Sequence, residues 1–218
     1  MYVHPAFKVD GAEALAMLRD RAFGLLVVTT PNGPVGVHLP FLVDERDDGR
    51  LRVDLHVARA NALHAHIGQG AKVMLACSGP DAYISPDWYG VPNQVPTWTY
   101  TSVHLAGTAR MMPESGLLAH VDRLSAYFEG QLLPKKPWTS GKMDETRRAA
   151  MLKAIVGIEI EVETIEAQKK LIQHKGQTEH AGAINGLRQR GDAGSATIAD
   201  LMEATARGKF GADFPKQS

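Results

Sequence analysis

Cysteine, net charge and long apolar runs are all scarce in this sequence of 218 residues. Its one cysteine, Cys77, excludes an internal disulfide, and the apolar run around it predicts a buried, unreactive thiol. Lysine and arginine total 24, as do aspartate and glutamate, so no overall field would draw the chain to DNA or to an acidic membrane. Any role in binding nucleic acid must therefore depend on a local patch.

No apolar run approaches the roughly 20 residues that are needed to span a bilayer. The first residues also lack the basic segment and the apolar segment of a secretory signal. A reducing compartment suits the single cysteine. We therefore expect a cytoplasmic protein with no membrane partner.

The sequence also lacks the motifs of several large functional classes. No Gly-x-Gly-x-x-Gly follows the first predicted strand and no Gly-x-x-x-x-Gly-Lys-Ser/Thr is present, which argues against a Rossmann dinucleotide site and a P-loop. A serine nucleophile would lack its Gly-x-Ser-x-Gly setting. His64 and His66 would point about 200° apart on a helix, so they could not share one ion. We predict no metal site.

The spacing of apolar residues predicts strands through the middle of the chain and helices towards the C-terminus. Asp10 and Glu13 have the form of a capping box before a helix at 11–21, and two β-rich runs flank a turn that contains Asn32 and Gly33. The predicted strands are 25–30, 35–43, 51–57, 72–77, 98–110 and 156–164. The other predicted helices are 62–67, a segment after 113, 143–155, 179–190 and 197–207.

About six strands joined by hairpin turns favour a closed or partly open barrel over a parallel sheet. The expected fold class is mainly β with helices (α+β). We expect a split β-barrel over residues 1–165 and a C-terminal helical extension over 166–218. The aromatic and proline-rich segment 79–98 is interpreted as a long loop, and loops of this length usually line sites.

Several short motifs stand in order along the first half of the chain. They are Met1-Tyr2 with Pro5 and Phe7, His38-Leu39-Pro40-Phe41, His56-Val57-Ala58-Arg59-Ala60-Asn61, Gly79-Pro80, Ala82-Tyr83-Ile84-Ser85-Pro86, Trp88-Tyr89 and Val95-Pro96-Thr97-Trp98-Thr99-Tyr100. Together they resemble the PaiB family of FMN-binding negative transcriptional regulators, a relative of the pyridoxamine-phosphate-oxidase split barrels. Farther on, residues 169–173 and 183–187 resemble the family's C-terminal motif, although Ile172 and His174 replace the expected serine and asparagine.

The resemblance implies FMN as the cofactor. FMN needs donors and positive charge for its phosphate, and Arg59, Ala60 and Asn61 stand where a strand hands over to a helix. Backbone N–H groups at such a corner and a bidentate guanidinium can hold a phosphate. The alternative is that Asn61 only caps the helix and that Arg59 is a solvated surface charge.

The other candidate residues border the flavin ring. The resemblance implies that Val37, His38, Leu39 and Pro40 form the strand beside it, and Pro40 suits a free edge because it donates no ladder hydrogen bond. His56 lies on a neighbouring predicted strand. Trp98 and Tyr100 would come from another strand, either of the same chain or of a partner subunit. Each of these aromatic side chains could instead be a packed core or interface residue.

Two functions from different classes stay open. The family implies a repressor or flavin-linked sensor, which we favour over an enzyme, with DNA as a partner by resemblance only. The alternative is an FMN-dependent oxidoreductase that acts on a small molecule, and some split barrels bind haem through one histidine. We also expect a homodimer, because so small a barrel would not bury its apolar strands and the segment 98–100 alone.

Overall fold

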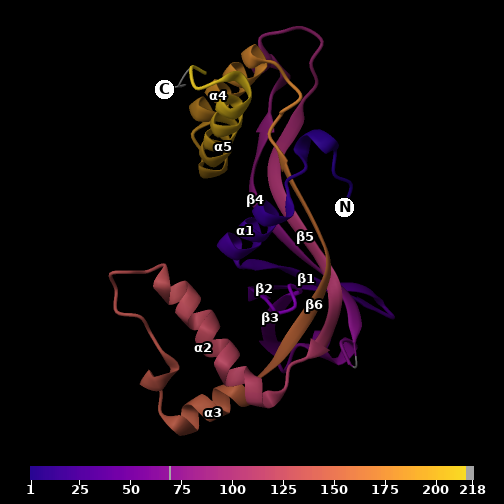
Figure 1. Ribbon diagram of the computed structural model, residues 1–218, viewed down its shortest axis with the longest axis vertical. Coiled ribbons are helices and arrows are strands. Elements are labelled where there is room, and N and C mark those ends of the chain that lie inside the picture. The colour runs from indigo at the N-terminus through magenta and orange to yellow at the C-terminus, as the bar shows by residue number, and fades with distance from the viewer. Residues whose placement is uncertain (69, 215–218) are drawn as a thin grey trace. The chain divides into compact units, whose positions relative to one another are not determined.

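The computed structural model describes residues 1–68 and 70–214, which form two compact units (Figure 1). The barrel unit contains Leu15–Cys77 and His104–Ile165. The terminal unit contains Met1–Ala14, Ser78–Val103 and the chain from Glu166 onward. Two segments from the first half of the chain therefore group with the C-terminal helices.

Six strands form a closed barrel in the order β1-β2-β3-β6-β5-β4. Their bounds are β1 Phe23–Thr30, β2 Gly33–Glu45, β3 Leu51–Ala58, β4 Ala71–Ile84, β5 Thr97–Met111 and β6 Ile155–Lys170. The pairs β1–β2, β1–β4, β2–β3 and β3–β6 are all antiparallel. The predicted α+β split-barrel class is confirmed.

The alternation of apolar and polar residues in β3 shows how the strands build the apolar interior of the barrel. Val53, Leu55 and Val57 point into the barrel and are buried together with apolar residues of every other strand. The β1–β2 hairpin turns at Pro31 and Asn32, because Thr30 already pairs with Gly33. Gly33 takes a positive φ of 107°, which glycine adopts without strain. The predicted hairpin is therefore confirmed, with a turn shorter than the predicted one.

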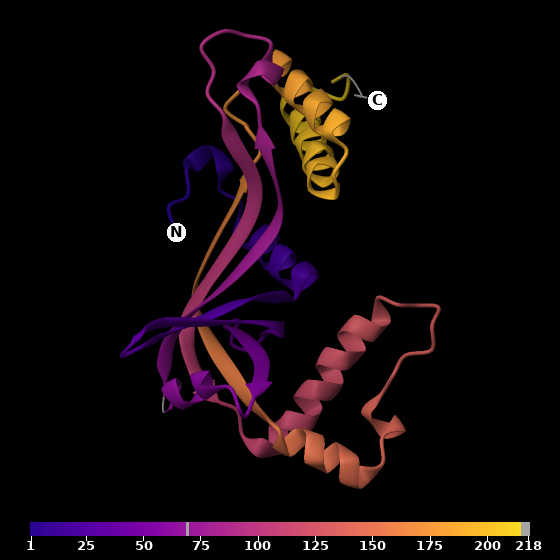
Figure 2. The same ribbon diagram turned by 180° about the vertical axis from the view of Figure 1, so that it is seen from behind.

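The helices follow most of the predicted ranges. They are α1 Gly11–Arg21, α2 Glu114–Gly130, α3 Glu145–Lys153, α4 Gln177–Arg190 and α5 Ala193–Phe210, with short 3-10 helices η1 Pro5–Phe7, η2 Ala62–His66, η3 Pro86–Tyr89 and η4 Ser140–Lys142. The predicted cap of α1 is confirmed, because the Glu13 N–H donates to Asp10 Oδ1 at 2.8 Å. Figure 2 shows the long connection from α2 to α3, residues 131–144.

Two predictions of local structure were wrong. Residues 79–84 belong to strand β4 rather than to a loop, because Ala82 and Ile84 are buried at a spacing of two despite the preceding Gly79 and Pro80. The helix predicted for 143–155 ends at Lys153, and Ile155 already begins β6. The remaining loop after β4 is thus shorter than expected.

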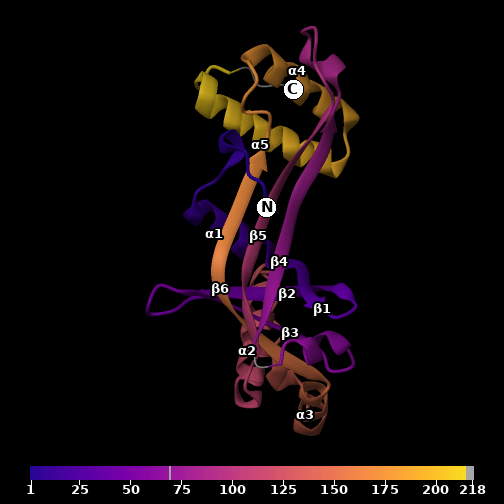
Figure 3. The same cartoon turned by 90° about the vertical axis from the view of Figure 1, so that its right-hand side faces the viewer.

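Within the terminal unit, α4 and α5 lie side by side (Figure 3) and share a core of buried aliphatic residues. Gly182 and Gly186 let α4 approach η3, because a Cβ at Gly182 would lie 1.9 Å from the Trp88 carbonyl oxygen and one at Gly186 would lie 2.2 Å from the Trp88 ring. Gly186 belongs to the stretch 183–187 that resembles the family's C-terminal motif, and Gly182 directly precedes it.

Cys77 is buried in β4, and burial raises the pKa of its thiol to about 12. The prediction of a buried thiol is confirmed, and a thiol with so high a pKa stays protonated at pH 7. No helix in the described ranges is both long enough and apolar enough to cross a membrane.

Candidate functional site

Strands β2 and β3 diverge along the segment of β2 that was predicted to border the flavin. β2 pairs with β1 from Gly33 to Pro40, but it pairs with β3 from Phe41 to Glu45. If the β2–β3 register continued, it would set Pro40 opposite His56 and Val37 opposite Arg59. We call this divergence the β2–β3 split. The two predicted groups of site residues thus belong to neighbouring strands of one unit.

Proline explains why the ladder stops there. The Phe41 N–H donates to the Ala22 carbonyl on the β1 side, so residues 40 and 38 direct their backbone groups towards β3. Pro40 has no N–H to donate at that position. The backbone N–H and carbonyl of His38 therefore face the open edge. This edge can pair with the polar rim of a planar ligand.

The side chains of this strand alternate as a barrel requires. Leu39 is buried in the core, and Val37 and Pro40 are partly covered. The exposed imidazole of His38 stacks on Phe23, with ring centroids 6.2 Å apart and planes 18° apart. His38 thus presents a flat aromatic surface beside the open edge.

The opposite strand ends in the predicted phosphate corner, where Arg59 is held by the backbone of its own unit. Its Nε donates to the Lys153 carbonyl at 2.8 Å and its Nη2 to the Ile155 carbonyl at 3.2 Å. About half of the side chain is exposed, and Glu114 is the nearest carboxylate at 3.9 Å. Arg59 is therefore more than a free surface charge, because it also ties the end of α3 to β3.

Asn61 caps the helix that follows, since its Oδ1 accepts the Leu63 N–H at 3.0 Å. The helix is the 3-10 segment η2, whose five residues carry little macrodipole. Positive charge at this corner consequently comes from Arg59. Ala58, Arg59 and Ala60 are all exposed, so the backbone of the corner is open to a ligand.

His56 contacts a helix that the sequence did not assign to the site. Its Nδ1 lies 3.1 Å from Nε2 of His120 on α2, and the rings meet edge to face. Burial lowers the pKa of His56. Burial first, then His56 and Arg123, lower the pKa of His120 to about 4. Both imidazoles are therefore neutral at pH 7.

Trp98 and Tyr100 belong to the terminal unit. Trp98 is exposed and meets the Tyr83 ring edge to face at 6.0 Å. The Tyr100 hydroxyl accepts a hydrogen bond from Gln168 Nε2 at 2.9 Å. Their role in a flavin site stays a prediction.

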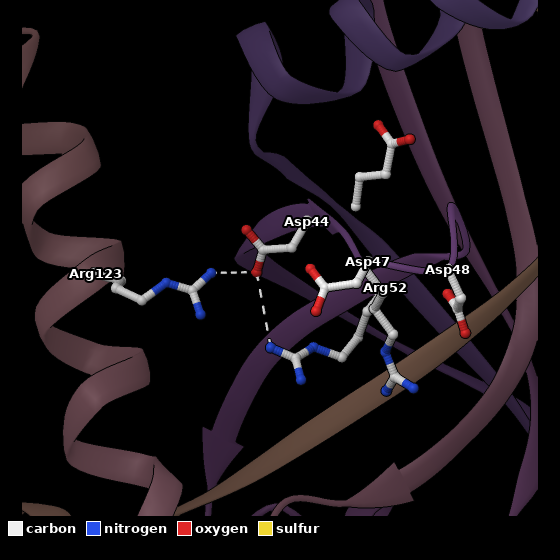
Figure 4. Close-up of a pocket in the computed structure, with 7 residues that line it drawn as sticks. Asp44, Asp47, Asp48, Arg52 and Arg123 are labelled. Atoms are coloured by element: carbon white, nitrogen blue, oxygen red, sulfur yellow. Dashed lines mark hydrogen bonds and ion pairs between the residues drawn. The ribbon is translucent and has the colours of Figure 1, made fainter.

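A cavity of about 590 Å³, lined by charged residues that include Asp44, Arg52 and Arg123, was not predicted from the sequence (Figure 4). Arg123 of α2 contacts Asp44, and Arg52 donates to the buried Asp54 at 3.0 Å. Burial raises the pKa of Asp54. Because Asp44 and Asp54 already engage both arginines, the cluster ties α2 to the barrel rather than offering free cations to an anion.

The terminal unit has a second cavity, of about 480 Å³, between η3 and α4. It is lined by Trp88, Tyr89, Gly90, Gln177, Thr178, Ala181, Gly182 and Asn185. These side chains carry no charge, so the cavity lacks the cation that a phosphate needs. In the ranges 1–68 and 70–214, no group of three or more histidine, cysteine, aspartate or glutamate side chains could hold a metal.

The residues at the β2–β3 split fit FMN. An exposed guanidinium and an open backbone corner suit a phosphate dianion. The unpaired edge at His38 supplies a donor and an acceptor for the rim of the isoalloxazine. Neither cavity described above combines these features.

Comparison with known proteins supports the same cofactor. Residues 1–164 match the family described as "Putative FMN-binding domain". The chain is 31% identical to protease synthase and sporulation protein PAI 2 of Bacillus subtilis, over 93% of this chain and 97% of that protein.

Among solved structures, the fold is similar to that of a conserved hypothetical protein from Mycobacterium tuberculosis, with a TM-score of 0.54, 16% identity and coverage of 78% of this chain and 91% of that one. It is also similar to an FAD and haem binding protein from Mycobacterium smegmatis, with a TM-score of 0.53, 13% identity and coverage of 76% and 73%. These two likenesses support the fold. The chain belongs to the PaiB-like family of FMN-binding split barrels, and FMN is its cofactor.

Proposed function

We propose that this chain is an FMN-binding regulatory or sensing protein whose flavin lies along the β2–β3 split. The observation that carries the proposal is that β2 leaves β3 beyond Phe41, which opens the edge at His38, while Arg59 is exposed just past the end of β3. The name of the Bacillus subtilis relative, protease synthase and sporulation protein PAI 2, refers to sporulation, a cellular process, and not to the oxidation or reduction of a small molecule. That name favours a regulator over an oxidoreductase.

In this proposal, the β2 side and the β3 side of the split bind different parts of FMN. Arg59 and the backbone N–H groups near Asn61 hold the phosphate. The backbone of Val37–Pro40 orients the ring, and His56 approaches it from β3. Bound FMN supplies one- and two-electron redox chemistry. The protein residues set its position and its access to water.

We also propose a homodimer in the cytoplasm, in which Trp98 and Tyr100 of the partner subunit lie near the flavin. Exposed apolar side chains support association, since Phe23 and Val35 lie exposed in the barrel unit and Val95 and Trp98 in the terminal unit. DNA as a partner rests on the family resemblance. The arginines of α4 and α5 do not strengthen it, because Arg188 and Arg207 both pair with Glu203 and Arg190 pairs with Asp192.

Replacing Arg59 by alanine is expected to weaken FMN binding by tenfold or more, because a charge-assisted hydrogen bond is worth about 1.5–3 kcal/mol. Riboflavin has no phosphate, so its affinity should stay the same. The apo variant should lose about 1 kcal/mol of stability, since two backbone carbonyls lose their donor. Fluorescence titrations with both flavins and a denaturant melt measure these effects.

Arg50→Ala is the matched control, because Arg50 is similarly exposed but pairs with Asp48 and Glu161 away from the split. It should bind both flavins like the wild type. An Arg59→Ala variant that keeps its FMN affinity, or loses FMN and riboflavin equally, would show that the phosphate lies elsewhere.

A further inference from the structure

A pair of histidines joins α2 to the strand that borders the split. Nδ1 of His56 and Nε2 of His120 are 3.1 Å apart, within hydrogen-bond distance. His120 is only 2% exposed, and its other nitrogen, Nδ1, has no hydrogen-bond partner among the residues described. The sequence marks His120 as buried, because it falls between Leu117 and Leu124 on the apolar stripe of the helix.

Only one proton can lie between these two rings. Burial keeps both imidazoles neutral at pH 7, and Arg123 beside His120 adds to this effect. Asp44 acts in the opposite direction but more weakly, and Arg52 again disfavours charge on His120. A neutral imidazole has one N–H and one lone pair, so one histidine of the pair must donate and the other must accept.

The unpartnered Nδ1 of His120 decides which ring donates. A buried N–H without an acceptor costs the full desolvation of a donor, whereas a bare ring nitrogen at the same place costs less. The proton of His120 therefore belongs on Nε2. From there it is donated to Nδ1 of His56, which must be unprotonated. His56 then carries its own proton on Nε2.

We propose that His120 is a positioning residue that holds His56 as its Nε2–H tautomer, so that His56 offers a hydrogen-bond donor to an acceptor atom of the flavin. His56 follows Leu55, the last residue of β3 that pairs with β2 before the split, and its ring is only partly covered. The donor role rests on the proposed function, because it requires the flavin to lie at the split. The tautomer itself does not depend on the flavin.

Nitrogen-15 NMR of the imidazoles in the apo protein tests the tautomer directly. At pH 7.5 we expect Nε2 of His56 and Nε2 of His120 to be protonated and both Nδ1 atoms to be bare. A spectrum in which Nδ1 of His56 carries the proton would overturn the proposal, whatever the protein binds.

Two substitutions at His120 test the donor role. His120→Gln keeps an N–H donor near Nδ1 of His56, so the tautomer should persist and FMN affinity should change less than about threefold. His120→Leu removes the donor, so the proton of His56 should move at least in part to Nδ1, and FMN affinity should fall about tenfold. Equal affinities in the two variants would overturn the donor role.

Tyr127→Phe is the control for a general loosening of α2, because it removes a hydrogen bond from the Tyr127 hydroxyl to the Arg19 carbonyl and leaves the histidine pair intact. It should keep the wild-type tautomer and FMN affinity, and a loss as large as that of His120→Leu would contradict the proposal. Failure of the proposed flavin site would show separately, as an unchanged FMN affinity in Arg59→Ala.

Discussion

Lowering the pH from 7.5 to 4.5 is expected to remove about 5 kcal/mol from the free energy of unfolding. Two buried histidines carry most of the loss, His120 in the barrel unit and His180 in the terminal unit. Burial lowers the pKa of each from 6.5 to about 4. His180 donates from Nε2 to the Ile172 carbonyl at 3.1 Å, while its Nδ1 lacks a partner within the described part of the chain.

The direction of this change in the free energy of unfolding depends on whether the folded or the unfolded state binds protons at the higher pH. Between pH 6.5 and pH 4 the unfolded chain protonates these histidines and the folded chain does not, so stability falls as the pH falls. Each group costs about 1.4 kcal/mol per pH unit in that window. His56 acts in the same direction, whereas Asp54, whose pKa is raised by burial, offsets part of the loss.

Urea unfolding at a series of pH values measures this dependence. His180→Gln keeps an amide donor for the Ile172 carbonyl but cannot titrate. The number of protons that the protein takes up on unfolding in acid should therefore fall by about one, and the free energy of unfolding should decrease less steeply as the pH falls. His66→Gln, at an exposed position, is the control for the substitution itself. Stability that stays constant between pH 7.5 and pH 4.5 would contradict the buried, neutral state of both histidines.

Gly182→Ala is expected to destabilise the terminal unit by about 3 kcal/mol. The new Cβ would lie 1.9 Å from the Trp88 carbonyl oxygen, and a backbone atom cannot swing aside as a flexible side chain can. To make room, α4 would have to move away from η3. The apolar core that α4 shares with α5 would be disturbed as well.

Gly208→Ala, on α5 in the same unit, is the matched control. A Cβ there meets nothing within 4 Å, so the change should stabilise the protein by about 0.5 kcal/mol through helix propensity alone. Thermal or urea melts of both variants give the comparison. A Gly182→Ala protein as stable as the wild type would show that α4 does not pack on η3 as closely as described.

The sequence predicted the barrel because strand alternation is a local property. Val53, Leu55 and Val57 mark β3 without reference to anything else in the chain. The polar half of the same strand was harder to interpret. Asp54 is as buried as its apolar neighbours, because α2 covers it and Arg52 and Arg123 supply partners. Alternation shows that two faces differ, but not what lies over each face.

The site was also hard to predict because several of its residues contact partners that are far away in the sequence. The role of Asn61 as a helix cap is local and was foreseen. The contacts of Arg59 are to carbonyls more than 90 residues away, so no spacing rule reveals them. His120 also lies far from His56 in the sequence, and only its place on a buried stripe hinted at its position. A free strand edge at Pro40 was expected from the sequence, but the change of partner from β1 to β3 beyond Pro40 was not, because it depends on the register of both neighbouring strands.

Amide NMR of the labelled protein during titration with FMN tests the central claim most directly. FMN should shift the amide signals of His38 and Leu39 on β2 and those of Arg59 and Asn61, which follow β3. Riboflavin should shift the first pair and leave the second pair nearly unchanged, because it has no phosphate. Signals at the split that stay fixed while those around Trp88 move would place the flavin between η3 and α4 and contradict the account.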